Sequence, residues 1–279
     1  MTGSRLDADL VRRGLARSRG HARELIAAGV VTVDGQVATK PATEVHADRV
    51  IALTRTQRTW VSRGSVKLLA ALDAWPQVAG AVRGGRCIDV GASTGGFTEV
   101  LLERGAAQIE AIDVGHGQLA DSVRSDPRVR DHSGMTVRAV AAESVGGPAG
   151  VVVTDLSFIS LTTVLPDLAR LMEPSGHLVA LVKPQFEVGR ERLGKKGIVR
   201  SLVEHRRVLA SVVEAATASR LHVRGLLQSP ISGSQGNVEY LMWVMSPPCV
   251  KMDPAAIAQE IVALTTPPGR EARTTGGLR

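Results

Sequence analysis

The sequence has few cysteines, few aromatic residues and no long hydrophobic run. Its two cysteines belong to no CxxC or Cys/His spacing, which argues against a disulfide framework or a metal site and fits a reducing, cytoplasmic environment. Seven Phe, Trp and Tyr residues together argue against an aromatic platform for stacking RNA bases. Residues 1–13 alternate charged and apolar side chains, so we expect neither a signal peptide nor a membrane span.

Charge of one sign is concentrated at the front of the chain. The 279 residues hold 34 basic and 27 acidic side chains, a net charge of +7, and only 6 of the basic residues are lysines. Residues 1–63 contain 11 basic and 6 acidic side chains, whereas the remaining 216 residues contain 23 and 21. A basic patch of this kind suits a polyanion, with a solvated arginine-rich surface as the alternative. The length allows one large domain or two ordinary ones.

The first 58 residues predict two short helices and a small sheet. Ser4 is placed to cap a helix that runs through Arg12, and Ser18 precedes a second helix that ends at Gly29. Alternating valines around the turn Asp34-Gly35 predict a hairpin, and Val50 to Leu53 predict a further strand.

The run RLDADLVRRGLARSRGHARELIAAGVVTVDG resembles the S4 RNA-binding domain, whose pattern is RLD, then S-R followed by A and L-I, then G-x-V-x-V-x-G. The resemblance covers about 50 residues. It implies that the arginines of the helix pair lie against RNA phosphates. These candidate RNA-binding residues are Arg5, Arg12, Arg13, Arg17, Arg19 and Arg23.

From Arg86 onward, β-branched runs alternate with helical patterns, which is typical of an α/β fold with a mostly parallel sheet. The predicted strands are Cys87–Val90, Gln108–Asp113, Val137–Val140, Val151–Asp155, His177–Val182, Leu221–Leu227 and Glu239–Met245. The predicted helices are Ser65–Trp75, Phe97–Arg104, Gln118–Arg124, Leu161–Leu171 and Ser201–Ala218. Ligands of such folds bind beyond the carboxyl ends of the strands.

The first of these strands runs into a glycine turn, DVGASTGGF, at residues 89–97. A dinucleotide loop would have glycine where Ser93 stands, so that interpretation weakens. The pattern instead resembles the first motif of S-adenosylmethionine (SAM) methyltransferases, with Asp113 at the next strand end to bind the ribose hydroxyls. The candidate SAM-binding residues are Asp89, Gly91, Ser93, Thr94, Gly95, Gly96, Phe97, Asp113 and Asp155.

Two motifs that the sequence lacks narrow the chemical class of the methyl acceptor. Asp155-Leu156-Ser157-Phe158 lacks the N/D-P-P-Y/F pattern of enzymes that methylate exocyclic amines. Methylation at cytosine C5 needs a thiolate, yet Cys87 begins a predicted buried strand and Cys249 lies in the tail. Both absences favour an oxygen acceptor. A ribose hydroxyl needs in-line alignment and loss of its proton, which a lysine amine can accept in its neutral form.

Lys67, Asp155, Lys183 and Glu239 resemble the K-D-K-E tetrad of FtsJ/RrmJ-like ribose 2′-O-methyltransferases. The segments VSRGSVKL, TDLSFISL, LVKPQFEVG and SGSQGNVEY, behind an S4 domain, resemble the TlyA family, once called hemolysins. That resemblance implies SAM-dependent 2′-O-methylation of cytidine in 16S and/or 23S ribosomal RNA. It implies that Lys183 promotes proton removal, that Asp155 and Lys67 tune and orient it, and that Glu239 helps to place the ribose.

The resulting prediction is a Rossmann-like class I SAM methyltransferase with a seven-stranded mostly parallel sheet, preceded by a small α+β S4 domain. We divide the chain into residues 1–57, a linker at 58–63, a methyltransferase domain at 64–246 and a largely disordered tail at 247–279, whose stretch 255–264 has a helical pattern. We expect a monomer that acts on ribosomal RNA in ribosomal subunits, without a membrane partner. The alternatives are a non-catalytic RNA-binding or assembly factor, a membrane-lytic protein and a pseudouridine synthase. The basic segment 189–200 is either an RNA contact or an exposed loop.

Overall fold

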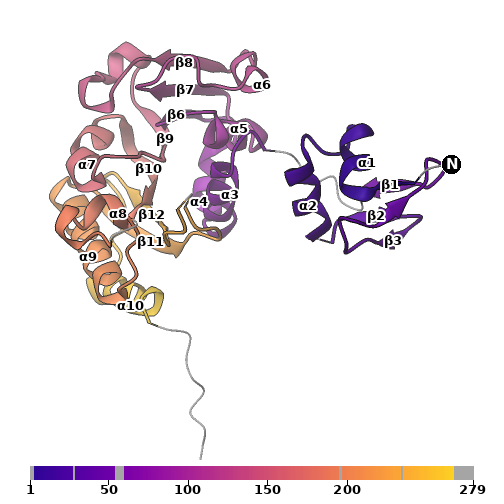
Figure 1. Cartoon of the computed structure of the whole chain (residues 1–279). Helices are drawn as coiled ribbons and strands as arrows, with labels where there is room; N and C mark the ends of the chain where they lie inside the picture. Colours follow the sequence, from indigo (N-terminus) through magenta and orange to yellow (C-terminus); the bar gives the residue numbers. More distant parts are fainter. Residues whose placement is uncertain (1–2, 28, 54–59, 195–196, 234, 267–279) are drawn as a thin grey trace, which may run out of the picture. The chain divides into compact units, whose positions relative to one another are not determined.

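The computed structural model describes residues 3–27, 29–53, 60–194, 197–233 and 235–266. By its internal contacts the chain divides into two units, Met1–Thr59 and Trp60–Arg279 (Figure 1). Trp60 and Val61, which belong to the candidate linker 58–63, pack against hydrophobic clusters of the larger unit. The last predicted linker residues, 60–63, therefore lie within that unit.

The small unit packs two helices on a short antiparallel sheet. The helices are α1 (Leu6–Arg12) and α2 (Arg19–Ala27), and the strands are β2 (Val31–Val33), β3 (Gln36–Val37) and β5 (Ile51–Leu53), in the order β3-β2-β5, with β1 (Ser4–Arg5) paired to β4 (Glu44–Val45). Leu6, Leu10, Leu25 and Ile26 form the centre of its core. The hairpin and the strand after Val50 are as predicted.

One prediction for the small unit is wrong. Ser4 does not cap α1, because it lies in β1 and its hydroxyl donates a hydrogen bond to the side chain of Asp9 instead. The cap prediction for the second helix holds, since the Ser18 hydroxyl accepts a hydrogen bond from the backbone N–H of His21.

The larger unit is built on a seven-stranded sheet in the order β11-β12-β10-β9-β6-β7-β8. The strands are β6 (Arg86–Val90), β7 (Gln108–Asp113), β8 (Val129–Ser133), β9 (Ala149–Thr154), β10 (Met172–Val182), β11 (His222–Gln228) and β12 (Tyr240–Met245). All neighbouring pairs are parallel except those of β12, which runs antiparallel to both β10 and β11. The predicted seven-stranded, mostly parallel sheet is confirmed.

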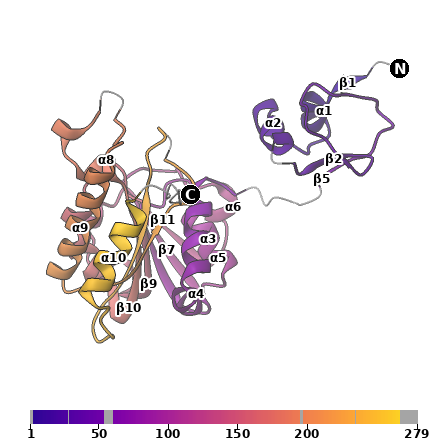
Figure 2. The ribbon, with the colours of Figure 1, turned by 90° about the horizontal axis from the view of Figure 1, so that it is seen from below.

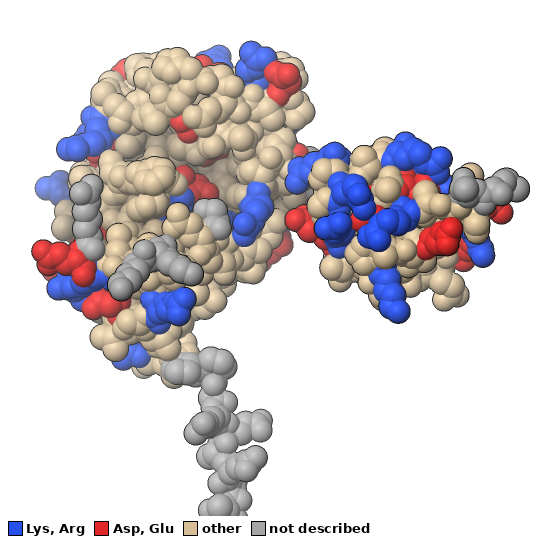
Figure 3. Space-filling view, in the orientation of Figure 1, with Lys and Arg blue, Asp and Glu red and all other residues tan. Residues whose placement is uncertain are grey.

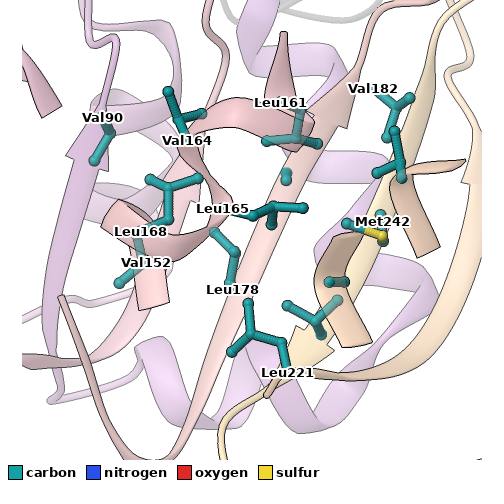
Figure 4. Packing of buried hydrophobic residues seen from close by; sticks show 14 of the residues in the cluster. Val90, Val152, Leu161, Val164, Leu165, Leu168, Leu178, Val182, Leu221 and Met242 are labelled. Carbon is teal, nitrogen blue, oxygen red and sulfur yellow. The ribbon is translucent and has the colours of Figure 1, made fainter. Parts of the chain in front are cut away.

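Side chains of the central strands alternate between two buried faces. Leu178, Ala180 and Val182 of β10 pack in one hydrophobic cluster, whereas Val179 and Leu181 pack in the other. This alternation follows from the two-residue period of a strand, and it explains why these strands appear in the sequence as continuous apolar runs. Figure 4 shows the first cluster, in which Leu161, Val164, Leu165 and Leu168 of one helix lie over the sheet.

Helices cover both faces of the sheet (Figure 2). One layer contains α3 (Gly64–Ala74), α4 (Pro76–Val82) and α5 (Gly96–Glu103); the other contains α7 (Leu161–Arg170), α9 (Leu202–Ala218) and α10 (Pro254–Leu264). The short helices α6 (Asp121–Arg124) and α8 (Pro184–Glu187) follow strands β7 and β10. Through Ile261, α10 packs on the core, so this part of the predicted tail is ordered, while residues 267–279 lie outside the described residues.

The predicted strand at Val137–Val140 is wrong. Residues Val137–Ala139 form a 3₁₀ turn, and the seventh strand is β8, which the sequence analysis missed. Arg130, Asp131 and His132 make β8 charged because it is an edge strand with only one neighbour. Because β8 is polar, it lacks the apolar pattern from which a strand is predicted. The apolar run around Val137 is not a strand and instead packs in the core beneath α7.

Candidate active site

Four charged side chains from four separate elements meet at one edge of the sheet. Lys67 belongs to α3, Asp155 follows β9, Lys183 follows β10 and Glu239 precedes β12. Carboxyl ends of parallel strands share an edge, and the antiparallel β12 begins where β10 ends, with Tyr240 paired to Val182. The topology therefore brings together residues 172 positions apart in the sequence.

These four residues form two ion pairs joined by a third, longer contact. The Nζ of Lys67 lies 2.6 Å from Oε2 of Glu239, and the Nζ of Lys183 lies 2.6 Å from Oδ1 of Asp155. A distance of 3.7 Å separates the Nζ of Lys67 from Oδ2 of Asp155 and links the pairs. The pairing is charge-balanced, as buried ions require: Lys67, Lys183 and Glu239 are buried, and the Asp155 side chain is 20% exposed.

The tetrad residues Lys67, Lys183 and Glu239 line a cavity of about 490 Å³. Phe158 and Phe186 also line it, with ring centroids 5.3 Å apart. Phe158 is 91% exposed and has a positive φ of 66°, a conformation rarely seen for an aromatic residue. A chain with seven aromatic residues thus leaves one of them almost bare beside the tetrad.

The glycine turn at the end of β6 has the backbone conformation expected of a ligand-binding loop. Gly91 and Gly95 have φ values of 84° and 94°, and Ser93 adopts a φ of 48°. A Cβ on Gly91 would lie 3.2 Å from the carbonyl oxygen of Asp155, so only glycine lets these two strand ends approach so closely. Thr94 and Gly96 complete the turn, and α5 starts at Gly96.

Asp89 is a fully buried carboxyl group with one oxygen lacking a partner. Thr98 donates a hydrogen bond to Oδ2 at 2.6 Å, whereas Oδ1 has no partner in the described residues. Burial, reinforced by the charges of Asp155 and Asp113 and opposed by the Thr98 hydrogen bond, raises the pKa of Asp89 to about 7. An unpartnered buried acceptor next to a glycine turn is suited to a cationic or hydrogen-bonding ligand.

Asp113 is held at the end of β7 by two backbone groups. The N–H of Ser93 donates to Oδ2 at 2.8 Å, and the N–H of Gly115 donates to Oδ1 at 2.7 Å. Each carboxylate oxygen keeps a second lone pair, so the group can still accept hydrogen bonds from a diol. The glycine turn, the orphaned oxygen of Asp89 and this oriented carboxylate fit the amino, carboxyl and ribose groups of SAM.

Five of the six candidate RNA-binding arginines divide into two groups around two buried aspartates. Arg5, Arg19 and Arg23 contact Asp7, at 3.1, 3.0 and 3.3 Å. Hydrogen bonds from these arginines, Arg5 foremost, hold the pKa of Asp7 far below its usual range. Figure 3 shows basic side chains gathered on one face of the small unit.

Arg12 and Arg13 pair with Asp9 instead. Burial favours a higher pKa for Asp9, but hydrogen bonds from Arg12, Ser4 and Arg13 outweigh it and lower that pKa. Arg13 also donates to the backbone carbonyls of His46, Ala47 and Arg49, so it ties α1 to the loop before β5. The side chain of Arg17 is exposed and has no ion-pair partner among the described residues.

Sequence reasoning missed two polar residues beside the tetrad. Ser157 accepts a hydrogen bond from Lys183 at 2.7 Å, and Gln185 donates to Glu239 at 3.4 Å. Both lie within two positions of a tetrad residue, which is the only signal that the sequence offered.

Burial raises the pKa of the Cys87 thiol to about 12, so this cysteine is not a nucleophile.

Over the described residues, no helix combines the length and apolar character that crossing a bilayer would need. The same residues contain no cluster of three His, Cys, Asp or Glu side chains arranged to hold a metal ion.

The sheet order, the glycine turn and the carboxylate at the next strand end define a SAM-dependent methyltransferase. Residues 60–245 match the family model of the FtsJ-like methyltransferases, and residues 4–51 match that of the S4 domain. The chain is 50% identical over 242 residues to the 16S/23S rRNA (cytidine-2′-O)-methyltransferase TlyA of Mycobacterium tuberculosis, covering 86% of this chain and 89% of that protein.

Two further relatives carry the older name. Hemolysin A of Brachyspira hyodysenteriae is 34% identical, with 85% of this chain and 98% of that protein covered. A solved structure named as a hemolysin, from Streptococcus thermophilus, superimposes with a TM-score of 0.70 at 36% identity and covers 95% of this chain and 96% of that one. The chain belongs to the TlyA family of FtsJ-like methyltransferases.

Proposed function

We propose that this protein transfers the methyl group of SAM to the 2′-hydroxyl of a cytidine in 16S or 23S ribosomal RNA. The observation that carries the proposal is the convergence of Lys67, Asp155, Lys183 and Glu239 at the edge of a cavity of about 490 Å³. The 50% identity to the M. tuberculosis rRNA (cytidine-2′-O)-methyltransferase supports the nucleotide and the RNA class.

SAM supplies an activated methyl group on a sulfonium, so the protein has two tasks, alignment and proton removal. We assign proton removal to Lys183, which lines the cavity and is oriented by Asp155 and Ser157. Lys67 lies between Asp155 and Glu239 and fixes the spacing of the two carboxylates. Glu239, which lines the cavity and is only 3% exposed, is placed to accept a hydrogen bond from the ribose.

Residues at the ends of β6 and β7 would hold the cofactor. Asp89, Gly91 and the turn from Ser93 to Phe97 would contact its methionine part, and Asp113 would accept hydrogen bonds from its ribose hydroxyls. Asp155 lies between the glycine turn and the tetrad, since its backbone carbonyl is next to Gly91 while its carboxylate contacts Lys183. A cofactor held by these residues would lie next to the tetrad.

The aromatic pair at the cavity, in which Phe158 is exposed and Phe186 is partly buried, suits a nucleobase taken out of its stack. Phe158 and Phe186 stand at the cavity with Lys183, and base stacking on an aromatic ring contributes about 1–3 kcal/mol. The S4 domain at residues 4–51 would contact RNA phosphates through its arginines. The substrate would be RNA within a ribosomal subunit, which places the activity in the cytoplasm, and we expect the protein to work as a monomer.

The test is transfer of a tritiated methyl group from SAM to ribosomal RNA and to both ribosomal subunits. We expect transfer by the wild type, and loss of transfer with near-normal SAM binding in Lys183→Ala. Lys251→Ala is the matched control, because Lys251 is exposed and lies outside the cavity. Full transfer by Lys183→Ala would contradict the assigned role, and a wild type that binds RNA and SAM without transfer would indicate an assembly factor.

A further inference from the structure

The chain contains a single asparagine, Asn237, two residues before Glu239. Its side chain is 1% exposed, and both ends of its amide are satisfied by one neighbouring segment. Oδ1 accepts a hydrogen bond from the N–H of Val199 at 2.9 Å, and Nδ2 donates to the carbonyl of Gly197 at 2.9 Å. A buried amide that matches one donor and one acceptor of the same backbone fixes that backbone in place.

The backbone of Asn237 closes a turn at the same position. Its carbonyl accepts a hydrogen bond from the N–H of Gly233 at 2.9 Å, and Gly236 donates to the carbonyl of Gly233 at 2.9 Å. Gly236 has a φ of 88°, which glycine adopts without strain. A Cβ on Gly233 would come within 2.4 Å of Oε1 of Glu239, so the turn packs directly against the tetrad carboxylate.

A second contact anchors the same segment from α9. Tyr240 and His205 are buried, and their Oη and Nδ1 atoms are 3.0 Å apart, while Nε2 of His205 is 2.9 Å from the carbonyl oxygen of Val199. Burial raises the pKa of Tyr240 to about 12, so the phenol keeps its proton and donates it to Nδ1. His205 therefore carries its hydrogen on Nε2 and donates to Val199.

Both backbone polar groups of Val199 are thus held, its N–H by Asn237 and its carbonyl by His205. Residues 197–199 on one side and residues 233 and 235–239 on the other both supply lining to the cavity beside the tetrad, namely Gly197, Gly233, Gln235, Asn237 and Glu239. Of the residues that hold the segments, Asn237 lines the cavity whereas His205 and Tyr240 do not, and none of the three belongs to the tetrad.

We propose that Asn237 is a positioning residue of the methyl-transfer site, which sets the wall that receives the target nucleotide and the place of the Glu239 carboxylate. The proposal rests on the proposed function. Asn237 acts through Val199, Gly197 and the turn at Gly233, and the pair of Tyr240 and His205 supports the same segment.

The chemistry of the amide explains why this position requires asparagine. Aspartate would replace the donor Nδ2 with an acceptor oxygen that faces the carbonyl of Gly197, and serine would be too short to reach both backbone groups. Alanine would leave the N–H of Val199 and the carbonyl of Gly197 without partners, and it would free the segment 197–199.

The first experiment compares Asn237→Ala with the wild type in steady-state methylation of ribosomal RNA. Because a displacement of about 1 Å in an active site costs on the order of a hundredfold in rate, we expect kcat/KM for RNA to fall about ten- to a hundredfold, mainly through kcat. The Kd of SAM stays within about twofold, since Asp89, Asp113 and the glycine turn make none of these contacts. A tenfold loss of SAM affinity, or unchanged kcat, would overturn the proposal.

Ser246→Ala is the matched control. Ser246 is a buried residue whose hydroxyl also joins two backbone groups, accepting from Gly176 and donating to Glu173, but at the far end of β10 and β12. It reports the effect of losing a buried backbone clamp as such. We expect a similar loss of thermal stability and unchanged kcat; a fall in kcat equal to that of Asn237→Ala would assign the effect to general destabilisation.

Tyr240→Phe keeps the test decisive if Asn237→Ala fails to fold. It removes one hydroxyl, and we expect a kcat decrease of a few fold, smaller than for Asn237→Ala, because His205 loses the donor that fixes its tautomer. In the double variant the two losses should be less than additive, since both substitutions release Val199. Strict additivity, or no effect of Tyr240→Phe, would contradict a shared action on that residue.

Hydrogen exchange separates this proposal from the proposed function. The amide of Val199 should exchange at least about tenfold faster in Asn237→Ala than in the wild type or Ser246→Ala, whether or not ribosomal RNA is the substrate. Protection at Val199 that survives the substitution would refute the clamp itself. Absence of ribosomal RNA methylation by the wild type, with the clamp intact, would refute only the proposed function.

Discussion

The Oδ1 atom of Asp155 lies 2.6 Å from the Nζ of Lys183, and each residue is the first after its strand. Because β9 and β10 are adjacent and parallel, their ends deliver the two side chains to one point without any loop having to adopt a special length. The other pair, Lys67 and Glu239, depends instead on helix α3 and on the reversed strand β12. The two halves of the tetrad should therefore respond differently to substitution.

Breaking the pair of Lys67 and Glu239 should cost stability unequally. In Lys67→Met, Glu239 stays buried with only a weak hydrogen bond from Gln185, and we expect a loss of about 3–5 kcal/mol in the free energy of unfolding. In Glu239→Gln, Lys67 keeps Asp155 at 3.7 Å, so the loss should be smaller. The double variant should regain stability without regaining methyl transfer. Urea unfolding and tritium transfer measure the two effects, and equal losses in the single variants would argue against this account.

The pKa of Asp89 predicts how stability depends on pH. Since it is raised from 3.8 to about 7 in the folded protein, the native state keeps a proton that the unfolded chain releases between these values. This group therefore lowers the free energy of unfolding as pH rises from about 4 to 7, by on the order of a few kcal/mol in all. Below pH 4 its penalty is absent, and above pH 7 it is complete.

Asp89→Asn should remove that dependence. Urea unfolding at pH 4.5, 6 and 8 should show that the free energy of unfolding of the variant increases relative to that of the wild type as pH rises. His177, whose pKa is lowered by burial, makes stability rise with pH and so acts in the opposite direction. Its contribution is the same in both proteins and cancels when they are compared. Parallel curves for the two proteins would show that Asp89 does not titrate in this range.

The alternation of apolar runs and helical periods was enough to predict six of the seven strands of the sheet. Five of them are interior strands of the sheet, and the sixth, the edge strand β11, still buries apolar residues such as Val223 and Leu226. It failed at β8, whose charged edge resembles a loop, and at α4, where Pro76 starts a short helix directly after Trp75. For the tetrad, the sequence supplied the residue types and the strand ends. The reversed direction of β12, which alone delivers Glu239 to Lys67, is a property of tertiary pairing that no local pattern contains.

Two arginines of the small unit should separate RNA contact from structure. Arg23 is 57% exposed and faces solvent beside Asp7, whereas Arg13 is 26% exposed and hydrogen-bonded to the loop at residues 46–49. Arg23→Ala should make the slope of log K for RNA against log salt shallower by roughly 0.7–0.9 and leave stability unchanged. Arg13→Ala should instead speed amide exchange in residues 46–49 with a smaller change in slope. The opposite pattern would reverse the assignment.

Phe158→Ala should weaken substrate binding without weakening the fold. The ring is 91% exposed, so its removal costs almost no buried area, and Ala keeps the Cβ that the positive φ must already accommodate. If a target base stacks on the ring beside Phe186, KM for RNA should rise about five- to 140-fold, the equivalent of about 1–3 kcal/mol. Phe158→Trp should retain most of the affinity because it preserves an aromatic face, whereas Phe158→Leu should not. Val250→Ala removes a comparably exposed apolar side chain away from the cavity and should change neither stability nor KM. Equal KM values for the Leu and Trp variants would show that bulk, and not an aromatic face, is what this position supplies.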